Sequence, residues 1–206
     1  MGSWLARLAH QGKSLVLGRK ARHPATLAAQ ELYGRAVAQS RAPTFYLAYG
    51  VPDTHDGRLE LIQLHVILLL RRLQRGDAAS QAIGQALFDV LFDDVDRSLR
   101  EGGVGDLVVG KWVKKIARQF YARAAAVEGA LEIGDGALLA SIVAENVYGG
   151  AAGGGPLRLA AYLLAVDGAL AAAAAAEPEP TRAVHFPPVA RIDTGSDAAA
   201  LTRAAS

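Results

Sequence analysis

The sequence contains no cysteine in its 206 residues. This absence excludes a disulfide framework, a thiolate metal site and a cysteine nucleophile, and nothing else in the chain indicates an oxidising compartment. Aromatic residues make up only 6% of the chain, whereas alanine contributes much of the 51% that is hydrophobic. Such a composition is typical of a helical protein rather than of a sheet.

A long apolar run is also missing. The most apolar run, Val66 to Leu70, ends at Arg71 and Arg72, whereas a membrane-spanning helix needs about 20 apolar residues. The alanine-rich stretch at 163–176 is interrupted by an aspartate and a glycine. We therefore expect both segments to form core or surface helices.

Carboxylates are absent from the first 30 residues, and we interpret residues 1–23 as a basic arm. Its apolar runs are too short for a secretory signal, but an arginine-rich segment without acids leaves a mitochondrial transit peptide open. Trp4 to Leu17 is either a short amphipathic helix at a membrane interface or part of a partly ordered arm. The net charge of +2 is too small for a dedicated DNA-binding protein.

Apolar residues spaced three and four apart predict an all-α protein. The helix expected to start at 57 or 58 is apolar around most of its circumference, so we place it at the centre of the core. We expect a single helical domain at 24–176, followed by an extended or disordered tail at 177–206 that adds little to the core. Its six expected helices cover about 24–40, 58–75, 78–100, 106–131, 137–148 and 157–175.

An aromatic segment follows the first expected helix, which should end before Pro43. Phe45, Tyr46 and Tyr49 lie within five residues, in a chain that has few aromatic side chains. Aromatic residues gathered beside a loop are typical of a binding surface. We therefore expect this segment to take part in recognition.

The loop after the aromatic segment contains three titratable residues, Asp53, His55 and Asp56, and His65 follows on the next helix. These four side chains are sufficient in principle for the metal site of a hydrolase. The same residues are also typical of a turn that leads into a helix. In such a turn Asp or Thr oxygens cap backbone amides, and Gly57 permits a bend. His65 shares a helix row with leucines, which favours a histidine in the core.

The helix expected at 106–131 carries a basic row that includes Lys111, Lys114, Lys115, Arg118 and Arg123. Trp112 and Tyr121 lie near this row and provide amphipathic anchors. Such a face contacts anionic lipid headgroups, RNA or an acidic partner, or is simply solvated. The chain has neither the Gly-Lys-Ser/Thr of a P-loop nor a nucleophile elbow, so we expect no enzyme.

Two long motifs carry a family resemblance. The stretches YGRAVAQSRAPTFYLAYGVPDTHDGRLELIQLH and LFDVLFDDVDRSLREGGVGDLVVGKWVKKIARQFYARAAA resemble, in content and order, the ubiquinol–cytochrome c chaperone family. The resemblance covers about 33–131 and continues more weakly to about 175. The matching positions are Arg41, Pro43, Tyr46, Pro52, Asp53, Gly57, Arg58 and His65 in the first motif, and Asp96, Leu99, Arg100, Glu101, Gly105, Asp106, Lys111, Lys114 and Lys115 in the second.

The resemblance implies an all-helical, non-enzymatic chaperone without a cofactor. Proteins of this family bind newly made cytochrome b and hold it for assembly of respiratory complex III. In eukaryotes they work in mitochondria, with a small partner subunit and near the ribosome. For this chain we expect a cytoplasmic protein at the bacterial inner membrane, in contact with anionic lipid, or a protein of the mitochondrial matrix.

Together these observations predict a surface for a client or partner protein. The alternatives are a metal-dependent hydrolase that uses the aspartates and histidines around residue 55, and a purely structural helical interaction domain. The predicted binding residues are Phe45, Tyr46, Tyr49, Arg58, His65, Lys111, Trp112, Lys114, Lys115, Arg118 and Tyr121.

Overall fold

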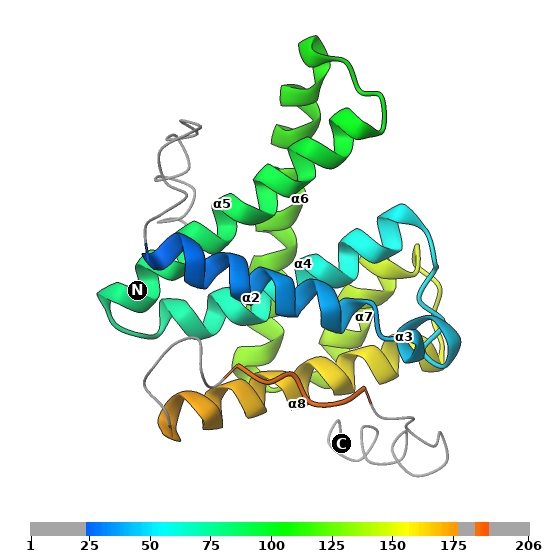
Figure 1. The fold of residues 1–206 in the computed structure, drawn as a ribbon. Coiled ribbons are helices and arrows are strands. Elements are labelled where there is room, and N and C mark those ends of the chain that lie inside the picture. Colours follow the sequence, from blue (N-terminus) through cyan, green and yellow to red (C-terminus); the bar gives the residue numbers. More distant parts are fainter. Residues whose placement is uncertain (1–23, 177–183, 190–206) are drawn as a thin grey trace.

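The computed structural model describes residues 24–176 and 184–189 (Figure 1). These residues form helices and no strand, which confirms the all-α prediction. The basic arm lies outside the described residues, and with it the alternatives of a transit peptide and of an amphipathic helix. The helices are α2 (Pro24–Ser40), α3 (Pro43–Leu47), α4 (His55–Gln74), α5 (Ala78–Glu101), α6 (Asp106–Ile133), α7 (Gly136–Val147) and α8 (Gly154–Ala176).

Six of these helices agree with the expected ones to within three residues at each end. Helix α3 is not among the expected helices, because the sequence pattern gives Pro43 only the role of ending a helix. Pro43 ends α2 and also opens α3, where its missing N–H costs nothing in the first turn. Gly105 occupies the capping position of α6, and Asp106 is the first helical residue.

Helix α4 is the centre of the core, as its apolar circumference predicts. It packs against α2, α5, α6, α7 and α8, and its side chains from Val66 to Leu70 are all fully buried. A helix surrounded on every side cannot present a polar face to solvent, which explains the nearly continuous apolar sequence.

Helices α5 and α6 form an antiparallel pair whose free end projects from the body as an arm (Figure 1). Leu91 and Phe120 lie in the body and are buried among several helices. In the arm, residues 96–119, Val109 is the one buried side chain. Two helices that pack only on each other leave much of their surface in solvent. The arm therefore exposes residues that a bundle would cover.

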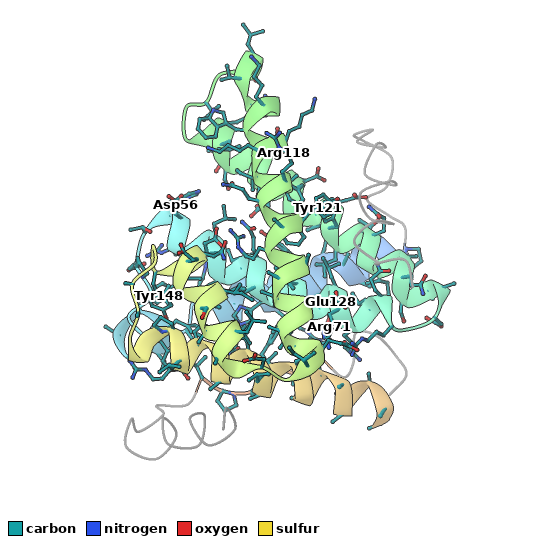
Figure 2. The ribbon with its side chains drawn as sticks, turned by 180° about the vertical axis from the view of Figure 1, so that it is seen from behind. Asp56, Arg71, Arg118, Tyr121, Glu128 and Tyr148 are labelled. Carbon is teal, nitrogen blue, oxygen red and sulfur yellow. The ribbon has the colours of Figure 1, made fainter. Side chains whose placement is uncertain are left out.

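One buried arginine connects three helices. Arg71 of α4 has a side chain that is only 4% exposed and donates to Asp167 of α8 and to Glu128 and Glu132 of α6. Figure 2 shows Arg71 beside Glu128 where α6 crosses the body. This cluster replaces solvent around the guanidinium group with carboxylates, the arrangement that a buried charge requires.

Residues 184–189 lie against the body, although the sequence predicts a tail that adds little to the core. Val184 is buried, and its carbonyl accepts a hydrogen bond from Arg35 of α2. Gln39 donates to the carbonyl of Pro187. Arg35 and Gln39 of α2 thus donate hydrogen bonds to backbone carbonyls that have no partner within an extended segment.

Among the described helices, α8 is long and apolar enough to cross a membrane when judged by length and composition. Four of its large apolar side chains, Leu159, Leu163, Val166 and Leu170, are nevertheless buried in the core. Helix α8 packs on α7 and α4. Of the two alternatives expected for this segment, a core or a surface helix, this packing favours the core helix.

Candidate binding groove and basic face

The aromatic segment contributes mainly to the core. Phe45 and Tyr49 have exposed fractions of 0% and 1%, and their rings meet edge to face with centroids 5.7 Å apart. Tyr46 is half-buried and donates its hydroxyl proton to the carbonyl of Ser40. Of the three aromatic residues predicted to bind a partner, Tyr46 alone reaches the surface, because Phe45 and Tyr49 pack beneath it into the helical body.

His65 is fully buried, so it is a core residue and cannot meet a partner at the surface. Its Nδ1 atom lies 2.7 Å from the carbonyl oxygen of Leu61, so this nitrogen carries the proton. The other nitrogen, Nε2, lies 2.9 Å from the Tyr162 hydroxyl and accepts from it. Burial lowers the pKa of His65 to about 4, which keeps the ring neutral.

The aspartates and histidines proposed for a hydrolase do not converge. Within the described part of the chain, no group of three or more His, Asp or Glu side chains is close enough to hold a metal ion. Both nitrogens of His65 are occupied in the core, and Asp53 pairs with Arg58 at 2.7 Å. The loop is instead a helix entry, in which the Thr54 hydroxyl caps the amide of Gly57.

A groove of about 680 Å³ lies where the arm joins the body. Its walls come from the first turns of α4, the arm helices α5 and α6, and the end of α7. Asp56 marks the α4 side in Figure 2. No local sequence pattern predicts this groove, because its walls are distant in sequence. Its apolar lining consists of Leu59, Ile62, Val95, Leu99, Trp112, Ile116 and Val147.

Arg123 lies among the residues that line the groove, not on the basic face where the sequence analysis placed it. Its side chain is only 6% exposed and donates to Glu60 at 2.7 Å. Its other nitrogens donate to Gln63 at 2.6 Å and Asn146 at 3.2 Å. Burial raises the pKa of Glu60 to about 7, although the charge of Arg123 opposes the change and Asp56 adds to it.

The rest of the basic row is a true surface, which we call the basic face: Lys111, Lys114, Lys115 and Arg118. All four side chains are exposed on α6, and Arg118 stands on the projecting arm in Figure 2. None of the four makes an ion pair with another described residue. This face therefore has positive charge available for a partner.

Exposed apolar side chains adjoin the basic face. Trp112 is 46% exposed with the ammonium group of Lys115 5.0 Å from its ring centroid, and Leu107 near the tip is 95% exposed. Tyr121, in contrast, is half-buried and stacks on Phe88 of α5. Trp112 is thus accessible to a partner as the sequence predicts, while Tyr121 serves mainly to hold the two arm helices together.

Comparisons with known proteins agree with this architecture. Residues 47–182 match the family described as ubiquinol-cytochrome C chaperone. The crystal structure of the Cbp3 homolog from Brucella abortus is similar to this chain, with a TM-score of 0.74 and 33% sequence identity. The similarity covers 81% of this chain and 92% of the Brucella chain. None of the curated proteins matches the chain.

The family match covers more than half of the chain, including the groove walls on α4, α5, α6 and α7. It also includes the buried ion pair between Glu60 and Arg123 and the whole basic face. Both the sequence motifs and the helical fold lead to the same assignment. The chain belongs to the ubiquinol–cytochrome c chaperone family.

Proposed function

We propose that this protein is an assembly chaperone that binds newly made cytochrome b during biogenesis of ubiquinol–cytochrome c reductase. The observation that carries the proposal is the groove at the base of the arm, which combines apolar walls with polar groups. A chaperone must cover apolar surface of its client for a time and then release it. A groove lined by both apolar and polar side chains suits such reversible binding.

The chemistry of the groove favours binding over catalysis. Arg123 is held by Glu60, Gln63 and Asn146, so its charge is used within the fold. No cofactor is needed for the proposed role. A small partner subunit or the ribosome, which the family resemblance implies, would add contacts elsewhere on the surface.

Deleting the gene and measuring cytochrome b tests the proposal. We expect the deletion strain to lose most of its spectroscopically detectable cytochrome b and its ubiquinol–cytochrome c reductase activity. Returning the wild-type gene should restore both, and an unrelated respiratory complex should keep its activity. Normal cytochrome b in the deletion strain would contradict the proposal.

We also propose that the basic face contacts the anionic inner membrane from the cytoplasmic side, or from the matrix side in a mitochondrion. Its support is the four exposed cations next to Trp112 and Leu107. Cations attract anionic headgroups at about 1 kcal/mol each, and a tryptophan settles at the headgroup level. Membrane contact would bring the groove close to a client that is entering the bilayer.

Vesicle binding tests this contact. Lys111→Glu, Lys114→Glu and Lys115→Glu together should reduce co-sedimentation with phosphatidylglycerol vesicles by at least about tenfold. The matched variant with arginine at the same three positions should bind like wild type, and binding should weaken with salt. Equal sedimentation of the glutamate and arginine variants would remove the membrane role from this face.

A further inference from the structure

The groove contains a carboxylate that the fold satisfies only in part. One oxygen of Glu60, Oε1, accepts a hydrogen bond from Arg123 at 2.7 Å. The second oxygen, Oε2, is buried and has no hydrogen-bond partner among the described residues. A buried acceptor without a donor is unfavourable, so a ligand that donates to this oxygen once the Glu60 side chain turns towards the groove gains affinity there.

A second acid lies one helical turn earlier on the same face of α4. Asp56 is exposed, lines the groove and makes no ion pair with any described residue. Its charge and that of Arg123 are the two that act on Glu60, with opposite effects on the Glu60 pKa. Asp56 and Glu60 therefore form an acidic pair. In this pair, the Oε2 atom of Glu60 has no hydrogen-bond donor and the carboxylate of Asp56 has no ion-pair partner among the described residues.

The other charged groups that line the groove are paired or do not act on Glu60. Arg58 binds Asp53, and Lys115, an exposed cation of the basic face, is not among the charges that act on Glu60. Asp94 accepts the Tyr33 hydroxyl and pairs with Arg97. Arg41 is exposed and is likewise not among the charges that act on Glu60. The acidic pair is thus the position in the groove that is complementary to a cation.

The apolar walls favour a helical occupant. Leu59 and Ile62 are three residues apart on α4, while the arm contributes pairs four residues apart on α5 and α6, Val95 with Leu99 and Trp112 with Ile116. Side chains at these spacings form rows along each helix, between which the apolar face of another helix fits. The volume of about 680 Å³ accommodates the side chains of a short stretch of one helix face.

We propose that the groove binds an apolar helical segment of the client that carries one arginine or lysine, and that this cation donates hydrogen bonds to Glu60 and Asp56. The inference rests on the proposed function and specifies which part of a client is held. A purely apolar segment would leave the Glu60 oxygen without a donor. The acidic pair thus selects, among apolar segments, those with a cationic side chain.

Site-specific crosslinking in the native membrane separates this inference from the proposed function. Benzoylphenylalanine is placed at Gln119, an exposed groove position, and at Ala82 and Ala126, which are exposed outside the groove. We expect a crosslink to cytochrome b from position 119 and none from the other two. Crosslinks from 82 or 126 alone would overturn the groove inference and leave the proposed function standing. No crosslink from any position, together with normal cytochrome b in the deletion strain, would overturn both.

Peptide binding tests the acidic pair directly. Trp4→Phe leaves Trp112 as the single tryptophan, so its fluorescence reports occupancy of the groove. The probes are two synthetic alanine- and leucine-rich helical peptides that differ in one central residue, arginine or glutamine. We expect the arginine peptide to bind about tenfold more tightly, the effect of one charged hydrogen bond.

The variants decide whether the acidic pair causes this preference. The double variant Asp56→Asn/Glu60→Gln should bind the two peptides with equal affinity. Asp56→Asn alone, a surface change, should reduce the affinity advantage of the arginine peptide. Glu101→Gln removes an exposed acid outside the groove and should leave this affinity advantage unchanged. Equal affinity of both peptides for the wild-type groove, or an advantage that survives in Asp56→Asn and in the double variant, would overturn the inference.

Discussion

Replacing Glu60 with glutamine should change how the stability of the protein depends on pH. In the folded chain the pKa of Glu60 is raised to about 7, while its ordinary value is 4.5. Between these values the folded state binds a proton that the unfolded state has released. The free energy of unfolding of the wild type therefore falls as pH rises from about 4.5 to 7, and glutamine, which does not titrate, removes this loss.

The magnitude follows from the difference between the two pKa values of Glu60. At about 1.4 kcal/mol per pH unit, the wild type should lose about 3 kcal/mol relative to Glu60→Gln across this range. The cause is the burial of the carboxylate, whose side chain is 17% exposed. Arg123 lowers this cost but does not remove it, because the guanidinium group is buried as well.

His65 has the opposite effect on the free energy of unfolding over nearly the same pH range. Burial lowers the pKa of His65 from 6.5 to about 4, so the unfolded state takes up a proton first as the solution is acidified. Stability from His65 is complete above pH 6.5 and is lost as pH falls towards 4. In the wild type the pH dependences that Glu60 and His65 give to the free energy of unfolding offset each other. In Glu60→Gln the dependence due to His65 should remain, so stability should rise with pH.

Urea unfolding followed by circular dichroism, from pH 4 to pH 8, measures both effects. The difference in unfolding free energy between Glu60→Gln and wild type should grow steadily from pH 4.5 to 7 and stay constant above. Any effect of the lost ion pair that does not depend on pH appears as a constant offset. A difference that is flat over the whole range would refute the argument that burial perturbs Glu60.

Two further pairs of variants test the fold. Arg71→Ala should lower the free energy of unfolding by about 3 kcal/mol, because three carboxylates lose a buried partner. Arg75→Ala removes an exposed ion pair and should have little effect in the same urea titration. Gly57→Ala should destabilise by about 2 kcal/mol, since a Cβ atom there would lie 2.1 Å from the Pro52 carbonyl oxygen. Gly34→Ala, where a Cβ atom meets nothing, should instead raise the melting temperature slightly, and equal effects at the two glycines would contradict the packing argument.

The role of Gly57 illustrates a limit of local sequence reasoning. The pattern indicated a glycine that permits a bend before a helix, yet Gly57 lies inside α4 and is needed because the Pro52 backbone passes close to it. The residue type was informative, but the reason depends on a neighbour that folds back onto the helix. The same applies to Arg123, whose spacing placed it on a basic face and whose environment is a buried ion pair.

The sequence by itself determined the described helices other than α3, the central position of α4 and the family, because helical periodicity and long motifs are properties of local order along the chain. The tertiary structure decided which side chains are accessible. Phe45, Tyr49 and His65 are buried and Trp112 is exposed because of how the helices pack. The groove and its acidic pair likewise exist only where segments distant in sequence meet, and no local pattern encodes that meeting.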